Sequence, residues 1–233
     1  MQMWSTAEFE AALRAVGETR YHDKHPFNVR MHAGALTKEE FRGWVLNRFY
    51  YQVNLPVKDA FILSKLPSRE DRRRWIQRIV AQDGRAGDEG GIESWLRLGE
   101  AVGLDRDELL GCRSVLPGVR FAVDAYVNFC QRSPWLEAVA SALSELFAPG
   151  LLRLRIARIQ QHYPWIPPEG LEYFQQRLTQ QPADIGHLRS LVLGTAHSRE
   201  EQERCVKALE FKCDVLWSLL DAVQLAYSPA GPG

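Results

Sequence analysis

The sequence lacks several patterns that would assign it to a common functional class. Its four cysteines, Cys112, Cys130, Cys205 and Cys213, form no Cys-x-x-Cys pair. Such pairs are typical of zinc sites and redox motifs, so we expect reduced thiols. None of the six histidines follows a glutamate by three residues, which is the ligand pattern of helical di-iron proteins. The sequence therefore predicts no metal centre.

An excess of charge and long apolar runs are also missing. The 29 basic side chains equal the 29 acidic ones, so the formal net charge is zero and gives no footprint for nucleic acid or an anionic membrane. No apolar run approaches the roughly 18 residues of a transmembrane helix, and the first residues do not have the pattern of a signal peptide. We expect a cytoplasmic protein without a nucleic-acid or membrane partner.

Alternating β-branched runs are absent, whereas apolar residues recur at helical spacing throughout. Ser5, Thr37 and Ser198 each stand three residues before a glutamate, which is the capping box that begins a helix. These signals predict an all-α fold, with a single helical domain over residues 1–233 and residues 228–233 as a disordered tail. We expect breaks between helices at residues 17–34, 82–91, 111–118, 164–168 and 180–184.

Polar side chains interrupt the apolar faces of these predicted helices. In the helical pattern from Thr37 to Pro56, Arg48 falls on the same stripe as Phe41 and Trp44. Tyr51 and Gln52 share that stripe, and Arg78, Arg155 and Lys212 occupy similar places in three later segments. A buried unpaired cation costs several kcal/mol, so four of them indicate a pocket for a polyanionic small molecule. Alternatively, each cation reaches water from the edge of its stripe or pairs with an acid such as Glu145.

Other motifs carry less chemistry. No Gly-x-Ser-x-Gly elbow is present, and the glycine-rich loop at residues 83–91 lacks the strand and the Gly-Lys-Ser/Thr ending of a phosphate loop. We interpret that loop as a connector beside the pocket. His22 follows the first predicted helix, where it could be a loop residue or a proton shuttle. Tyr173 and Arg177 lie four residues apart on one helix face and could contact a carboxylate or a quinone oxygen.

Several longer segments resemble the pyrroloquinoline-quinone synthase family. They include Asn47-Arg48-Phe49-Tyr50-Tyr51-Gln52, Leu116-Pro117-Gly118-Val119-Arg120-Phe121, Glu145-Leu146-Phe147-Ala148-Pro149 and His162-Tyr163-Pro164-Trp165-Ile166. The similarity runs from about Phe9 to Tyr227 without a large gap. It implies a compact helical bundle like haem oxygenase, a homodimer, and an oxidase that needs neither metal nor organic cofactor.

The resemblance also implies a reaction. The family closes a ring in a carboxylate-rich precursor and removes eight electrons with dioxygen as co-substrate, which releases hydrogen peroxide and pyrroloquinoline quinone. A tricarboxylate product agrees with the inward cations. Matched position by position, the resemblance implies catalytic roles for His22, Gln82, Tyr173 and Arg177, and substrate binding by Arg48, Tyr51, Gln52, Lys58, Arg78, Tyr126, Glu145, Arg155 and Lys212.

The chain departs from the family at three points. Gln82 stands where the family has a histidine that is regarded as a base, and glutamine does not titrate near neutrality. Leu152 replaces a residue that is polar in many members, and the sequence ends without the family's longer tail. Gln82 leaves open the alternative that the protein binds the quinone or its precursor without completing the reaction.

Overall fold

The computed structural model describes residues 2–228, except for the side chains of residues 180–184. Over that range the chain is helical, and its one β-bridge is the isolated pair Arg85–Asp88. The all-α prediction is confirmed. The elements are α1 (Thr6–Arg20), η1 (His22–Lys24), α2 (Pro26–His32), α3 (Lys38–Lys65), α4 (Arg69–Asp83), α5 (Gly90–Ala101), α6 (Arg106–Gly111), α7 (Pro117–Arg132), α8 (Trp135–Ser141), η2 (Ala142–Phe147), α9 (Ala148–His162), η3 (Pro168–Leu171), α10 (Glu172–Thr195) and α11 (Arg199–Tyr227).

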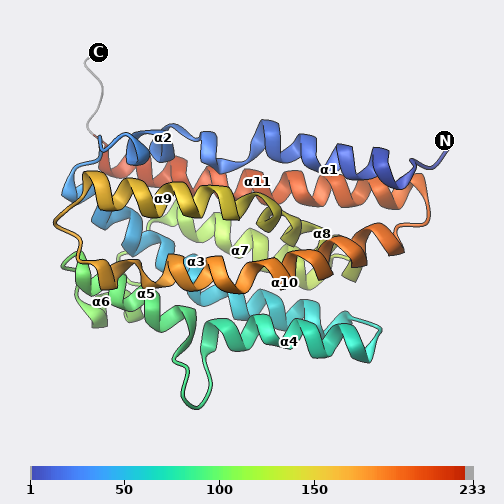
Figure 1. Ribbon diagram of the computed structural model, residues 1–233, viewed down its shortest axis with the longest axis horizontal. Helices are drawn as coiled ribbons and strands as arrows, with labels where there is room; N and C mark the ends of the chain where they lie inside the picture. Colours follow the sequence, from blue (N-terminus) through green and yellow to red (C-terminus); the bar gives the residue numbers. More distant parts are fainter. Residues whose placement is uncertain (1, 229–233) are drawn as a thin grey trace.

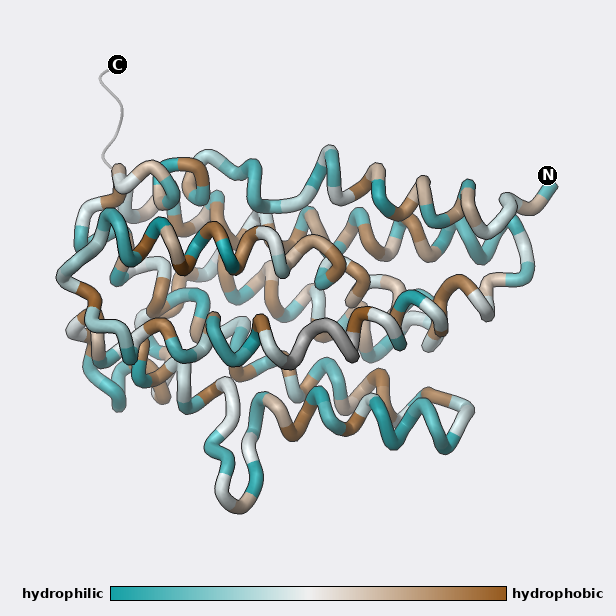
Figure 2. The backbone as a smooth tube through the Cα atoms, in the orientation of Figure 1, coloured by the Kyte–Doolittle hydropathy of each residue, from teal (hydrophilic) through white to brown (hydrophobic). Residues whose placement is uncertain are grey.

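The long helices run side by side along the long axis of the molecule (Figure 1). Helix α3 packs against α4, α5, α7 and α11, and α11 also packs against α1 and α8. Apolar residues recur at intervals along each helix rather than in continuous runs (Figure 2). Each helix therefore turns one stripe inward, as the spacing of its apolar residues predicts.

The predicted helix starts are confirmed at the capping boxes. Ser5, Thr37 and Ser198 each accept a hydrogen bond from the backbone N–H three residues on, and the glutamate at that position accepts one from the cap. These paired bonds satisfy amide donors that an isolated helix end leaves unpaired.

Two predicted breaks and one predicted helix end need correction. Helix α1 continues to Arg20, and α2 lies within the break expected at residues 17–34. Helix α3 passes through Pro56 and ends at Lys65, and α10 continues through the break expected at residues 180–184. A proline inside a helix costs about 3 kcal/mol, but in α3 the packing against four other helices outweighs that local cost. The tail predicted at 228–233 lies, except for Ser228, outside the described residues.

Gly17 allows a close approach that a larger residue would prevent. A Cβ atom at this position would lie 2.2 Å from the ring of Phe147. Phe147 also packs against Tyr21, with ring centroids 5.3 Å apart. The end of α1 is thereby held against η2, and this contact places Tyr21 and His22 next to the interior of the bundle.

One apolar stretch, Trp135–His162, is long and apolar enough to span a membrane by composition, with a mean hydropathy of 1.2 in its most apolar window. In the fold it is divided among α8, η2 and α9, and 56% of that window is buried within the protein. Core segments of soluble bundles meet the same criterion, so packing explains its composition.

Candidate active site

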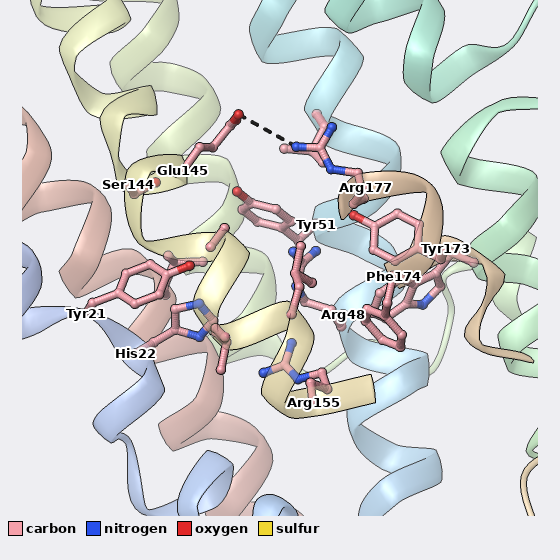
Figure 3. A pocket seen from close by; sticks show the side chains of 16 residues that line it. Tyr21, His22, Arg48, Tyr51, Ser144, Glu145, Arg155, Tyr173, Phe174 and Arg177 are labelled. Atoms are coloured by element: carbon pink, nitrogen blue, oxygen red, sulfur yellow. Dashed lines mark ion pairs between the residues drawn. The ribbon is translucent and has the colours of Figure 1, made fainter. Parts of the chain in front are cut away.

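A cavity lies among the junction of α1 and η1, the short helix η2, and the helices α3, α5, α9, α10 and α11 (Figure 3). It contains about 660 Å³ of space between side chains, part of it open to solvent. Its lining residues are Tyr21, His22, Arg48, Tyr51, Leu55, Trp95, Ser144, Glu145, Ala148, Leu151, Leu152, Arg155, Tyr173, Phe174, Arg177 and Leu216.

Three arginines and one glutamate line the cavity, so its ionised lining has a surplus of two positive charges. Arg48 stacks over the ring of Tyr51 at 3.8 Å, and its buried Nη1 has no hydrogen-bond partner among the described residues. Arg155 donates from Nη2 to Asn28 Oδ1 at 2.9 Å, whereas its buried Nε has no partner in the same part of the chain. Unpaired buried donors are costly, and an anionic ligand would satisfy them.

Arg155 is the most strongly desolvated of these cations. Burial, partly opposed by Tyr21 and reinforced by Arg48, lowers the pKa of Arg155 from 12.5 to about 10. Burial together with Arg155, Arg48 and Lys212 holds the pKa of His22 well below its ordinary value of 6.5. The imidazole is therefore neutral near pH 7, while the guanidinium stays charged.

Glu145 balances two of the cations. Arg78 donates to it from Nη1 at 3.1 Å, and Arg177 Nη2 lies 3.6 Å from its Oε2. Burial alone would raise the pKa of Glu145, but Arg78 and Arg177 bring it down to about 2. Arg78 also donates to Asp59 at 3.4 Å. Arg78 is therefore paired with acids, which is the alternative that the sequence left open for each cation.

This pairing predicts an acid-dependent contribution to stability. Since the pKa falls from 4.5 to about 2 on folding, ionised Glu145 stabilises the protein above pH 4.5 by roughly 3 kcal/mol, and that contribution is lost as the pH falls towards 2. Urea unfolding of the parent and of Glu145→Gln should therefore differ most at pH 7 and progressively less from pH 4.5 downwards. A difference that stays constant from pH 7 to pH 3 would contradict the assignment.

The remaining predicted residues lie behind the cavity wall. Lys212 is 2% exposed, donates to the Tyr51 hydroxyl at 2.6 Å and lies over the ring of Tyr126 at 3.6 Å. Tyr126 itself lies 3.3 Å from the Ser141 hydroxyl, and Lys58 donates to Asp59 at 2.7 Å. Burial is the main cause that lowers the pKa of Lys212 well below 10.5, and the neighbouring cations Lys58 and Arg48 lower it further.

Gln52 and Gln82 form a pair of their own. Gln52 donates from Nε2 to Gln82 Oε1, and both side chains are buried, but neither lines the cavity. The glycine-rich connector that follows Gln82 extends away from the bundle (Figure 1) and contributes no lining residue. The chain reverses in this loop at a turn closed by Arg85 and Asp88.

The cavity thus contains His22, Arg48, Tyr51, Glu145, Arg155, Tyr173 and Arg177 from the predicted set, and it does not contain Gln52, Lys58, Arg78, Gln82, Tyr126 or Lys212. Sequence reasoning missed Ser144 and Phe174, which line it, and Asn28, which supports it from behind. A small hydroxyl or a phenyl ring on an apolar stripe carries no signal that distinguishes a cavity wall from the core. Among the described residues, no group of three or more His, Cys, Asp or Glu side chains could hold a metal ion.

A model of the TENA/THI-4/PQQC family matches residues 10–222. The chain is 56% identical over 223 residues to pyrroloquinoline-quinone synthase from Pseudomonas putida strain W619, covering 96% of this chain and 88% of that protein. It shows the same identity and coverage with the enzyme of that name from Pseudomonas syringae pv. tomato.

Solved structures match the fold at low sequence identity. A domain of unknown function with a haem oxygenase-like fold from Shewanella denitrificans has a TM-score of 0.78 and 15% identity, covering 99% of this chain and 98% of that one. A TenA homologue from P. horikoshii has a TM-score of 0.74 and 16% identity, covering 92% and 97% respectively. The predicted haem oxygenase-like bundle is confirmed.

Proposed function

The chain belongs to the TENA/THI-4/PQQC family, and from that premise we propose that it catalyses the final step of pyrroloquinoline quinone biosynthesis. In this reaction a ring closes in a carboxylate-rich precursor and eight electrons pass from it to dioxygen, with release of hydrogen peroxide. The 56% identity to enzymes named pyrroloquinoline-quinone synthase supports an oxidoreductase of this kind.

One feature of the cavity carries the proposal. Buried donors on Arg48 and Arg155 point to no protein acceptor among the described residues, in a site whose ionised lining is cationic. Planar carboxylates match the forked geometry of guanidinium groups and would supply the missing acceptors. A ligand with several carboxylates on a flat ring system therefore fits the charge of the site and its unpaired guanidinium donors.

The residues on the far side of the cavity have complementary roles in this proposal. Arg177 binds a carboxylate or a quinone oxygen, and its pairing with Glu145 sets the direction of its guanidinium. Lys212 donates to the oxygen of Tyr51, so the Tyr51 hydroxyl hydrogen is left to point towards the ligand. Each of these groups is positioned before the ligand arrives, which lowers the entropic cost of binding.

The lining residues Tyr173 and His22 carry exchangeable protons beside the ligand space, and we assign each of them a role in the reaction. Tyr173 is 6% exposed, and its ring meets Trp95 edge-on at 4.8 Å between centroids. That contact orients the phenol towards the ligand. We assign Tyr173 to proton transfer and His22 to holding an oxygen atom of the substrate or of dioxygen.

The proposal includes dioxygen as co-substrate, pyrroloquinoline quinone as product, and neither metal nor organic cofactor. It also includes a homodimer in the cytoplasm. Metal analysis of the purified active protein tests the first part, and analytical ultracentrifugation tests the second.

The decisive experiment mixes the protein with the precursor under anaerobic conditions and then admits air. We expect no quinone absorbance before oxygen and quinone formation with hydrogen peroxide release after it, in protein treated with a chelator. Failure to form quinone in air, with intact binding of the precursor, would reject the enzymatic proposal.

That outcome would favour the second candidate, a binder of the quinone or its precursor. The observation behind it is the position of Gln82, which pairs with Gln52 and lies outside the cavity lining. In the proposed reaction Gln82 acts indirectly, by holding α4 against α3 through its hydrogen bond with Gln52. If the protein binds the precursor without converting it, the hydrogen bond between Gln52 and Gln82 has no catalytic role.

A further inference from the structure

Asn28 links His22 and Arg155, two residues of the cavity that come from different parts of the chain. Its side chain is fully buried on α2 and does not line the cavity. Asn28 Oδ1 accepts from Arg155 Nη2 at 2.9 Å, and Asn28 Nδ2 lies 2.6 Å from the His22 carbonyl oxygen and 3.2 Å from His22 Nδ1. All three contacts are within hydrogen-bond distance.

The direction of every bond in this bridge is determined. A guanidinium can only donate, so the atom of Asn28 that faces Arg155 must be its carbonyl oxygen. The atom that faces His22 is therefore the amide nitrogen, which has two hydrogens and no acceptor capacity. One hydrogen reaches the His22 carbonyl, and the other reaches Nδ1.

The ring of His22 must then accept at Nδ1, which cannot carry a proton at the same time. In the neutral imidazole the proton lies on Nε2. Nε2 has no hydrogen-bond partner among the described residues, and His22 lines the cavity. Figure 3 shows the His22 ring beside the guanidinium of Arg155 at one end of the site.

We propose that Asn28 is a positioning residue that locks His22 as the Nε2–H tautomer and holds it beside Arg155, so that the two side chains donate together to one anionic oxygen of the ligand. His22 in this state is a hydrogen-bond donor and has no free lone pair with which to accept a proton. The ligand half of this inference rests on the proposed function; the tautomer does not.

The surroundings of His22 keep it neutral. Burial is the largest cause of its lowered pKa. The cations Arg155 on α9, Arg48 on α3 and Lys212 on α11 lower it further, and His25 does so from beyond η1. The Tyr21 ring contacts the His22 ring edge-on, with 4.5 Å between centroids. Protonation at Nδ1 would also place two donors, the ring N–H and the Asn28 amide, against each other.

Long-range proton–nitrogen NMR of ligand-free protein labelled with ¹⁵N-histidine reads the tautomer directly. We expect His22, assigned by the loss of its signals in His22→Gln, to carry its proton on Nε2 from pH 6 to pH 9. His25 is an internal reference, because its Nδ1 accepts from the Phe27 backbone N–H at 3.0 Å. A proton on Nδ1 of His22 in the parent protein would overturn the proposal.

Asn28→Asp reverses the bond at Nδ1 and preserves the acceptor for Arg155, while it removes the donor to the His22 carbonyl oxygen. The carboxylate requires a proton on His22 Nδ1, so the NMR signature of His22 should invert while that of His25 stays unchanged. The affinity for pyrroloquinoline quinone should fall by roughly 10- to 100-fold at pH 9, where His22 would present a lone pair, and recover towards pH 6, where the imidazolium regains its Nε2 proton.

Asn47→Asp is the matched control. Asn47 is equally buried and hydrogen-bonded, to Gly43, Tyr227 and Leu116, but it lies outside the cavity. It should lower stability without giving quinone affinity a pH dependence. The positioning role would be overturned by an equal pH dependence of quinone affinity in both variants, or by an unchanged His22 NMR signature in Asn28→Asp. If the NMR result is as expected but the protein does not bind the quinone, the proposed function is rejected and the tautomer assignment stands.

Discussion

Replacing Tyr173 by phenylalanine should slow quinone formation by about 10²- to 10⁴-fold, which is the usual contribution of one proton-transfer group. The ring would keep its edge contact with Trp95, so the cavity should retain its shape and its affinity for the product. Single-turnover rates after admission of air to the anaerobic complex measure this effect. The reason is that only the hydroxyl of Tyr173, and not its packing, is assigned to the chemistry.

Tyr163→Phe is the control for that experiment. The Tyr163 hydroxyl is also buried, donates to the Met31 carbonyl at 3.0 Å and accepts from the Leu36 amide at 3.3 Å, but it lies outside the cavity. Its loss should lower the free energy of unfolding by about 1 kcal/mol and leave the rate unchanged. Equal rates in the parent and in Tyr173→Phe would exclude Tyr173 from proton transfer.

Arg48→Met should weaken the binding of pyrroloquinoline quinone by about 1.5–3 kcal/mol while changing the free energy of unfolding by less than about 1 kcal/mol. In the ligand-free protein, stacking of Arg48 on Tyr51 is stabilising, whereas desolvation of its unpaired Nη1 is destabilising. The substitution removes both effects, so the changes in the free energy of unfolding offset each other. Titration by absorbance and urea unfolding give the two quantities.

Arg30→Met should show the opposite behaviour. Arg30 lies 2.7 Å from the buried carboxylate of Glu40, at a distance from the cavity lining. Removing it leaves that carboxylate without its cation, which should destabilise the fold by about 2 kcal/mol and leave quinone affinity intact. If Arg48→Met lost stability and kept affinity, the anion-binding assignment of the cavity would fail.

Local signals in the sequence predicted most of the helices. The capping boxes at Ser5, Thr37 and Ser198 act through bonds between residues three apart, so tertiary contacts are not needed to recognise them. The helix end predicted at Pro56 was wrong for the complementary reason. The cost of that proline is local, whereas the packing that outweighs it comes from helices far away in the sequence.

The cavity residues were also predictable in part, from local patterns alone. Cations on apolar stripes were recognisable from periodicity, and Arg48 and Arg155 do line a common cavity. Periodicity gives the direction of a side chain relative to its own helix and carries no information about its partners. Arg78 therefore shared the same pattern, yet it pairs with Glu145 and Asp59.

The sequence by itself determined the all-α class, the helix starts and the inward direction of the cations, because each depends on neighbours within one or two helical turns. Only the tertiary structure decided which cations remain without protein acceptors and which residues lie behind them. The contact between Asn28 and Arg155 joins positions 127 residues apart, and no local pattern encodes that distance. The tautomer of His22, and with it the donor character of that end of the cavity, follows from this long-range contact.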